Sequence, residues 1–200
     1  MDEVSWAKKA EIQQRKWREN NKVLLGQNGK QNGVAKEHIL PADQWLRGTW
    51  GDADLRNLLL HYLEVEQIQA NQGKHNLKSS WTQCTNLFSP FRYHPHMKYM
   101  LASFLRRELD LDVSRIDSVE LEYAAPGKLA PRELLGETGG KRGSGQTSPD
   151  VAIVFTCDDG RCGIYLVENK YTEHHFYPCS AAKKTLAGCG KTQVECFMSR

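Results

Sequence analysis

Two apolar segments joined by a short polar turn constrain the fold of this chain more than any other feature. Residues 148–155 and 163–170 are rich in β-branched and aromatic side chains, and Asp158, Asp159 and Gly160 between them favour a turn. This pattern predicts a β-hairpin of two buried strands. Antiparallel pairing brings the start of the first strand beside the end of the second.

Charged residues stand at those two adjoining strand ends. Asp150 lies at the start of the first strand, and Glu168 and Lys170 lie at the end of the second. Side chains two residues apart in a strand project to the same side, so Glu168 and Lys170 point together while Asn169 points away. We therefore expect two carboxylates and a lysine to converge at one edge of an apolar sheet.

This set of side chains has the chemistry of a magnesium site. Mg²⁺ binds a few carboxylate oxygens and leaves its other positions to water and substrate phosphate. A neighbouring lysine such as Lys170 can orient or deprotonate the attacking water and stabilise a negatively charged transition state.

The motif Pro149-Asp150, a spacer, and Glu168-Asn169-Lys170 resembles the PD-(D/E)XK nuclease superfamily, over about residues 95–175. The resemblance implies a restriction-endonuclease-like fold and a metal-dependent DNA endonuclease. It implies Asp150, Glu168 and Lys170 as catalytic residues. Asp150, Glu168 and the Asn169 carbonyl would bind Mg²⁺, for which Mn²⁺ can substitute. DNA is the implied partner, and a homodimer is one option because cutting both strands usually calls for two active sites.

A helix predicted at about residues 96–110 offers a further acidic ligand. Glu108 falls in the middle of the face predicted to point inward, where a carboxylate needs a partner. In the resembled superfamily a glutamate of the first core helix often joins the metal site, which makes Glu108 our candidate. The alternatives are that Glu108 is solvated or pairs with a neighbouring arginine. Glu120 or Glu122, in a strand predicted at about residues 116–123, is another source of this ligand.

Two further segments are candidates for nucleic-acid contacts. Residues 74–95 lack clear periodicity and predict a loop, which contacts phosphates through Lys78 and Ser79 or is a packed connector. The glycine-rich residues 139–145 carry Lys141 and Arg142 and lead into Asp150. They form either a basic loop that closes over a phosphate backbone or a surface loop without that role.

The complete order of elements predicts an α/β protein. Helices are predicted at residues 5–20 and 53–71, the second capped by Asp52 and stopped at Gly73, with a turn or hairpin at 27–33. From residue 96 the order is helix, three strands, a helix near 180–187 and a strand near 193–197, which suits a sandwich with a mixed central sheet flanked by helices. Residues 1–95 would be a helical extension packed on a nuclease core of residues 96–200.

The composition excludes few functions. A net charge of +3 does not by itself indicate a nucleic-acid-binding protein, because the clustering of charge matters more than its sum. The chain contains no apolar run of membrane-spanning length and does not start like a signal peptide, so we expect a cytoplasmic protein with no membrane partner.

The cysteines support a different hypothesis. Six are many for the cytoplasm, where disulfides are rare, yet their spacing does not match zinc knuckles. Some nucleases of the resembled superfamily bind an iron–sulfur cluster with one upstream and three C-terminal cysteines, and the chain departs from that spacing. We favour reduced cysteines over a structural zinc or iron–sulfur cluster. The alternative functions are a catalytically inactive nucleic-acid-binding or complex-forming module and an interaction protein stabilised by a cysteine-bound metal. The cysteines of this chain are Cys84, Cys157, Cys162, Cys179, Cys189 and Cys196.

Overall fold

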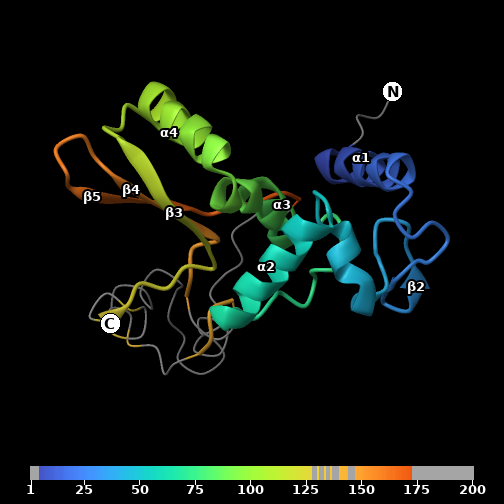
Figure 1. The fold of residues 1–200 in the computed structure, drawn as a ribbon. Helices are drawn as coiled ribbons and strands as arrows, with labels where there is room; N and C mark the ends of the chain where they lie inside the picture. Colours follow the sequence, from blue (N-terminus) through green and yellow to red (C-terminus); the bar gives the residue numbers. More distant parts are fainter. Residues whose placement is uncertain are drawn as a thin grey trace, which may run out of the picture.

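The computed structural model describes residues 5–127, 130, 133, 136, 140–143 and 147–172. Figure 1 shows a small sheet at one side of the molecule and most of the helices at the other. In chain order the elements are α1 (Trp6–Asn20), β1 (Lys30–Gln31), β2 (Val34–Ala35), the 3-10 helix η1 (Ala42–Gly48), α2 (Ala53–Val65), α3 (Ser80–Tyr93), α4 (Pro95–Leu109), β3 (Arg115–Leu121), β4 (Val151–Thr156) and β5 (Cys162–Val167).

The predicted hairpin of two apolar strands is confirmed. β4 and β5 pair antiparallel from Val151 opposite Val167 to Thr156 opposite Cys162. β3 pairs antiparallel with the other side of β4, which makes β4 the central strand. The α/β class is confirmed, and the strands that the structure describes pair only antiparallel. The predicted helix at 180–187 and strand at 193–197 lie outside the described residues.

One hydrophobic core joins this sheet to three helices. Val151, Ala152 and Ile153 are consecutive buried residues, as expected for a central strand that is covered on both faces. Helices α2, α3 and α4 all contribute side chains to the same core. Because residues on both sides of position 95 share it, α2 and α3 pack in one core with the sheet. The domain division at residue 95 stays a prediction.

Helix α3 replaces the loop that we predicted at residues 74–95, and that prediction was wrong. Six consecutive residues at the start of this helix, 81–86, are buried. Several of them are polar, and they are satisfied inside the protein: Gln83 donates a hydrogen bond to the Leu77 carbonyl, and the Asn86 side chain accepts one from the Trp50 N–H. A helix surrounded by protein has no polar face, so its sequence shows no amphipathic period.

The N-terminal predictions agree with the structure except for the end of α2. α1 lies within residues 5–20, and β1 and β2 form a short hairpin around the predicted turn. The carboxylate of Asp52 caps α2 by accepting a hydrogen bond from the Leu55 N–H at 2.9 Å. α2 ends at Val65, earlier than the predicted stop at Gly73, because the chain turns at Gln67, which has a φ of 53°.

A buried arginine organises the chain that follows α1. The guanidinium of Arg18 donates hydrogen bonds to the carbonyls of Val23, Gln27 and Glu37 and to the side chain of Asn28. These bonds close the loop onto the helix. Burial lowers the pKa of Arg18 from its usual value.

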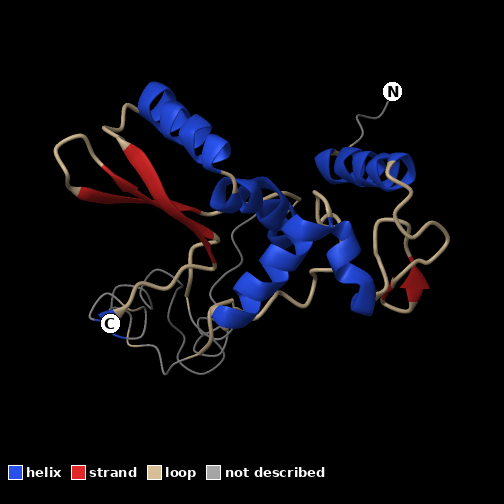
Figure 2. Ribbon diagram, viewed as in Figure 1, coloured by secondary structure: helices blue, strands red, loops and turns tan. Residues whose placement is uncertain are grey.

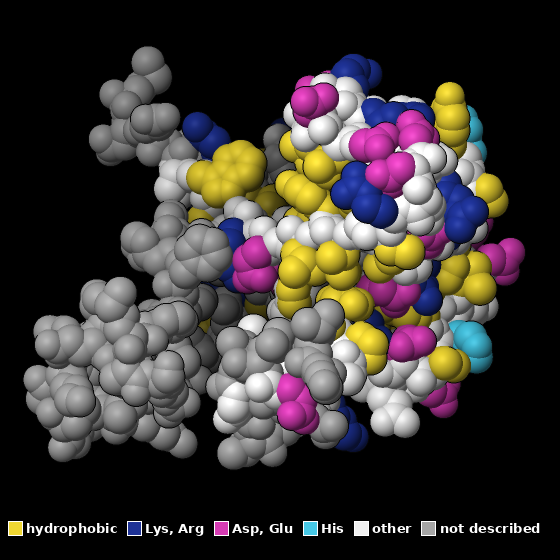
Figure 3. Space-filling view, turned by 90° about the vertical axis from the view of Figure 1, so that its left-hand side faces the viewer, with side chains coloured by type: hydrophobic (Ala, Val, Ile, Leu, Met, Phe, Trp, Pro, Cys, Tyr) yellow, Lys and Arg dark blue, Asp and Glu magenta, His cyan; other side chains and the backbone are white. Residues whose placement is uncertain are grey.

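α4 packs along β3 at the side of the sheet (Figure 2). β5 forms the opposite edge of the described sheet and exposes Ile164, Tyr165 and Leu166. Figure 3 shows hydrophobic side chains interspersed with charged ones on the face of the molecule that it displays. Within the described part of the chain, no helix has the length and apolar character needed to cross a membrane.

Candidate active site

The register of the hairpin brings the predicted catalytic residues together. Val151 and Val167 form the pair at one end of the β4–β5 ladder. Asp150, just before Val151, and Glu168, just after Val167, therefore lie at the same end of the sheet. The backbone N–H of Asn169 donates a hydrogen bond to Oδ2 of Asp150 at 2.6 Å. This bond fixes the Asp150 carboxylate against the strand that carries Glu168.

Glu168 and Lys170 form an ion pair at this end. Lys170 Nζ lies 2.5 Å from Glu168 Oε1, and both side chains are partly exposed. The Asn169 side chain does not join them, because its amide donates to the carbonyl of Ser80 at the start of α3. The alternation expected for an extended strand therefore holds across this motif.

Glu122 supplies a further carboxylate at the same end of the sheet. It directly follows β3, and its N–H donates to the Asp150 carbonyl at 2.9 Å. Its φ of 47° is in the left-handed region, which costs an L-residue about 1–2 kcal/mol. Backbone strain of this kind is common at functional sites.

The environment of Glu122 disfavours its negative charge. Burial first, and then the nearby Asp150 and Glu168 carboxylates, raise the pKa of Glu122 to about 7. The hydrogen bond from the Ser148 hydroxyl and the charge of Arg142 act in the opposite direction. A buried carboxylate beside two others is the arrangement that a bound cation would stabilise. We named Glu122 from the sequence only as an alternative to Glu108.

Cys84 places α3 beside the same carboxylates. It is buried, and burial raises the pKa of its thiol, with further contributions from the charges of Asp150, Glu122 and Glu168. Its thiol therefore stays protonated at neutral pH. The first turns of α3 thus form one wall of this end of the sheet, which we call the acidic end, defined by Glu122, Asp150, Glu168 and Lys170.

The structure does not bring Glu108 to the acidic end. Glu108 lies in the last turn of α4, and its exposed carboxylate pairs with Arg107 at 2.5 Å. We expected its helix to be buried on the face of Leu101, Phe104 and Leu105. Leu101 and Leu105 are buried, but Phe104 is 48% exposed. The expectation that Glu108 points inward was wrong, because the last turn of α4 is not covered.

Arg142 is held inside the protein and not on an open loop. Its guanidinium donates hydrogen bonds to the carbonyls of Leu121 and Glu122 and pairs with Glu66 at 2.7 Å. Its side chain is only 16% exposed. This position does not support the predicted contact between Arg142 and DNA. Arg142 instead holds the end of β3 in place, and with it Glu122.

The other residues predicted to contact nucleic acid are Lys78, Ser79 and Lys141. Lys78 pairs with Glu11 at 3.4 Å, and its carbonyl accepts a hydrogen bond from the Thr172 hydroxyl. Ser79 is the N-terminal boundary residue of α3. Lys78 and Ser79 therefore lie close in space to the segment that follows Lys170. Lys141 is exposed.

The turn end of the sheet carries a second group of possible metal ligands. One ligand atom from each of Asp112, Cys157 and Asp159 lies within 4.8 Å of the others. Asp159 already pairs with Arg161 at 2.6 Å, and the pKa of the Cys157 thiol is raised, which disfavours the thiolate form needed to bind a metal. Cys84, Cys157 and Cys162 are free cysteines, and the remaining cysteines lie outside the described residues.

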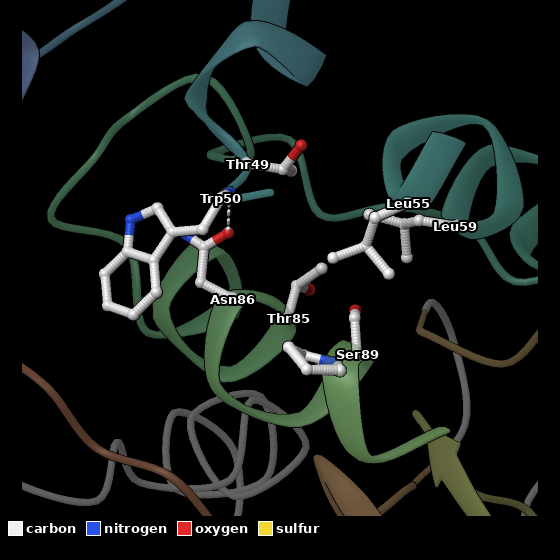
Figure 4. Close-up of a pocket in the computed structure, with 8 residues that line it drawn as sticks. Thr49, Trp50, Leu55, Leu59, Thr85, Asn86 and Ser89 are labelled. Carbon is white, nitrogen blue, oxygen red and sulfur yellow. Dashed lines mark hydrogen bonds between the residues drawn. The ribbon is translucent and has the colours of Figure 1, made fainter. Parts of the chain in front are cut away.

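A small internal cavity between α2 and α3 does not offer another site. Thr49, Leu55, Thr85 and Ser89 are among the residues that line it (Figure 4). Its volume, about 10 Å³, is enough for one water molecule at most.

Comparison with known proteins agrees with the resemblance found in the sequence. A family model described as "Restriction Endonuclease associating with ARP" matches residues 10–197. The chain belongs to this family. The match includes the strands, α3 and every residue of the acidic end, and it assigns the chain a restriction-endonuclease-like relationship. No curated protein and no solved structure matches the chain.

Proposed function

We propose that this family member is a magnesium-dependent DNA endonuclease of the PD-(D/E)XK type, with a restriction-endonuclease-like fold. One observation carries the proposal: Glu122, Asp150, Glu168 and Lys170 lie at the same end of the sheet, where burial and the charges of Asp150 and Glu168 raise the pKa of Glu122 to about 7. A protein gains nothing in stability from crowding carboxylates in this way. A bound cation would remove the repulsion.

The residues of the acidic end fit a magnesium ion. Glu122, Asp150 and Glu168 offer carboxylate oxygens, which are the ligands that hard cations such as Mg²⁺ prefer. The Asn169 carbonyl stays a proposed further ligand. When bound, the ion supplies positive charge that activates water and stabilises the leaving oxygen. The turn end suits this ion less well, because it combines two carboxylates with a protonated thiol.

Lys170 would position the attacking water. In this structure its ammonium group pairs with Glu168 at 2.5 Å, so it stands at the carboxylates where the scissile phosphate would bind. An ammonium there can donate a hydrogen bond to the attacking water and stabilise the charge that develops on the phosphate. Asn169 supports the site with two hydrogen bonds. Its N–H binds the Asp150 carboxylate, and its side chain binds the carbonyl of Ser80 in α3.

The surroundings also favour a phosphate backbone as the ligand. The amino end of α3 lies beside this motif, because Ser80 accepts the hydrogen bond from Asn169. Helix amino ends favour phosphate groups through their N–H donors and dipole. Lys78 and Ser79, at this end of α3, are proposed DNA contacts, and the exposed Lys141 is a third.

The family description also suggests a partner. It names an association with ARP, and we propose that this chain acts in such an association. A homodimer stays the alternative way to place two active sites on opposite strands.

The proposed activity is tested by incubating the protein with supercoiled plasmid and labelled single-stranded DNA in magnesium, in manganese and in chelator. We expect metal-dependent cleavage that falls by about 10²- to 10⁴-fold in Lys170→Ala. Lys36→Ala is the matched control, because Lys36 is an exposed lysine in the loop after β2.

Two results would decide against the proposal. Cleavage that persists undiminished in Lys170→Ala would show that the acidic end is not the active site. Metal-dependent DNA binding without cleavage, under every condition, would favour the alternative of an inactive nucleic-acid-binding module.

A further inference from the structure

α1 runs beside the segment that follows the catalytic motif. The indole N–H of Trp6 donates a hydrogen bond to the carbonyl of Tyr171 at 2.7 Å, and Gln14 donates to the Tyr171 hydroxyl at 3.2 Å. Tyr171 is the next residue after Lys170. Consecutive Cα atoms are about 3.8 Å apart, so α1 lies within reach of a nucleotide bound at the acidic end. Figure 1 shows the chain beyond β5 running toward α1 and α3.

Trp6 is fixed in place and yet exposed. Its ring meets the Tyr171 ring edge-on, with centroids 6.2 Å apart and planes at 84°. The hydrogen bond and this contact hold the indole in one orientation, but 60% of the residue is exposed to solvent. Tryptophan is highly buried on average in folded proteins. The sequence of α1 suggested either that its aromatic side covers the core or that its basic residues lie on DNA. Ala10 is buried and Trp17 packs against a small core cluster, whereas Trp6 stays exposed.

Basic and amide side chains extend from Trp6 along one side of α1. Lys9, Gln13 and Lys16 follow it by three, seven and ten residues, a spacing that places them on the same helix face. All of them are exposed. On the other side of α1, Lys8 pairs with Glu11, which also pairs with Lys78.

An exposed, oriented indole followed by lysines has the properties of a single-strand binding surface. Nucleobases stack on aromatic side chains, while cations along a groove follow the phosphates. A base inside a duplex has both faces covered by its neighbours, so the indole can stack on an unpaired base but not on a base in the interior of an intact duplex.

We propose that Trp6 stacks on an unpaired base of the DNA strand whose phosphate is bound at the acidic end, and that Lys9 and Lys16 follow the phosphates of the same strand. The substrate is then DNA with unpaired nucleotides next to the cleavage point. This inference rests on the proposed nuclease function and specifies its substrate.

The test compares binding of a labelled single-stranded oligonucleotide with binding of the matching duplex. Magnesium is present, and every protein carries Lys170→Ala so that the DNA is not cut. Trp6→Ala should weaken single-strand binding by about 5- to 150-fold, which corresponds to the loss of one stacked base, and should leave duplex binding nearly unchanged. Trp6→Phe should restore part of the affinity, and Trp6→Leu should not.

Trp6→Leu also controls for packing, because it keeps an apolar side chain at the start of α1. Circular dichroism and the unfolding midpoint must match in the three Trp6 variants. Single-strand affinity that is unchanged in Trp6→Ala would overturn the inference, as would an equal loss for single strand and duplex. Affinity in Trp6→Leu equal to that in Trp6→Phe would also overturn it, since a packing role alone predicts that result.

The two proposals fail in different ways. If the unchanged protein cleaves plasmid, and if Trp6→Ala does not alter the preference for single strand over duplex, the nuclease function stands and the stacking inference fails. If no DNA is cleaved but single-strand binding depends on the aromatic ring at position 6, stacking stands and the nuclease function fails.

Discussion

The two ends of the three-stranded sheet both gather acidic side chains, but in opposite environments. At the acidic end, Glu122 is largely buried beside Asp150 and Glu168, and its pKa is raised to about 7. At the turn end, Asp159 is exposed, and hydrogen bonds from the backbone and side chain of Arg161 lower its pKa. The Asp159 carboxylate is solvated and paired, as Glu168 is with Lys170, whereas Glu122 is largely buried in surroundings that disfavour its charge.

On the proposed assignment, burial and mutual repulsion identify a cation site better than the proximity of ligand atoms does. One ligand atom from each of Asp112, Cys157 and Asp159 lies within 4.8 Å of the others, yet Asp159 pairs with Arg161 and the pKa of the Cys157 thiol is raised. The acidic end also carries a strained residue, Glu122, and the Asp150 carboxylate is fixed by the Asn169 N–H. Fixed carboxylates in a partly buried site are the ones that a metal would use.

The largest expected effect is on DNA cleavage by matched aspartate variants. Asp150→Asn should reduce magnesium-dependent plasmid cleavage by at least about 10²-fold, since it removes a charged ligand and changes a group that touches the proposed ion. Asp159→Asn, which makes the same chemical change at the turn end, should cleave at the rate of the unchanged protein. Equal losses in the two variants would remove the distinction between the two ends.

A smaller effect is expected on stability, and it depends on pH. Glu122 has a folded-state pKa of about 7, above the usual 4.5, so it binds a proton more tightly when folded. The contribution of Glu122 to the free energy of unfolding is therefore fully present below the pKa that this carboxyl has in the unfolded chain. It is lost as the pH rises through about 7. The difference between the two pKa values corresponds to about 3 kcal/mol. We expect the free energy of unfolding in chelator to fall more between pH 5 and pH 8 in the unchanged protein than in Glu122→Gln.

Urea unfolding at those two pH values measures this difference directly. Groups elsewhere, such as His38, whose pKa burial lowers, titrate equally in both proteins and cancel in the comparison. If both proteins show the same pH dependence, the Glu122 carboxylate is not disfavoured by its surroundings. The acidic end would then be no different from the turn end in this respect.

The smallest effect is expected at the turn end. Arg161→Ala removes an ion pair between two exposed side chains, which water already solvates. We expect no measurable change in the thermal unfolding midpoint and no change in cleavage. A clear loss of stability would mean that the Arg161–Asp159 ion pair stabilises the fold more than two exposed side chains are expected to.

The sequence predicted the parts of this molecule that depend on local patterns. Alternation of side chains placed Glu168 and Lys170 together, and the turn residues between 155 and 163 fixed the pairing that brings Asp150 to them. The cap at Asp52 also follows from a local rule. These features need only neighbouring residues and strand geometry, so they are visible without a structure.

The remaining errors arose where tertiary contacts override the local pattern. α3 was missed because protein surrounds it, so polar residues such as Gln83 and Asn86 are buried and no amphipathic period remains. Helical periodicity predicted that Glu108 points inward. Periodicity does not show where a helix extends beyond the surface that it packs against, as the last turn of α4 does. Arg142 lies in a glycine-rich segment that predicted an open loop, but its contacts with Leu121 and Glu66 come from distant parts of the chain.

The most direct test of the central claim is a calorimetric titration of magnesium into the unchanged protein, Asp150→Asn and Asp159→Asn. We expect that the unchanged protein and Asp159→Asn bind the ion with the same affinity, and that Asp150→Asn loses most of the binding. If Asp159→Asn loses binding and Asp150→Asn keeps it, the metal belongs to the turn end and the assignment of the acidic end as the active site is wrong.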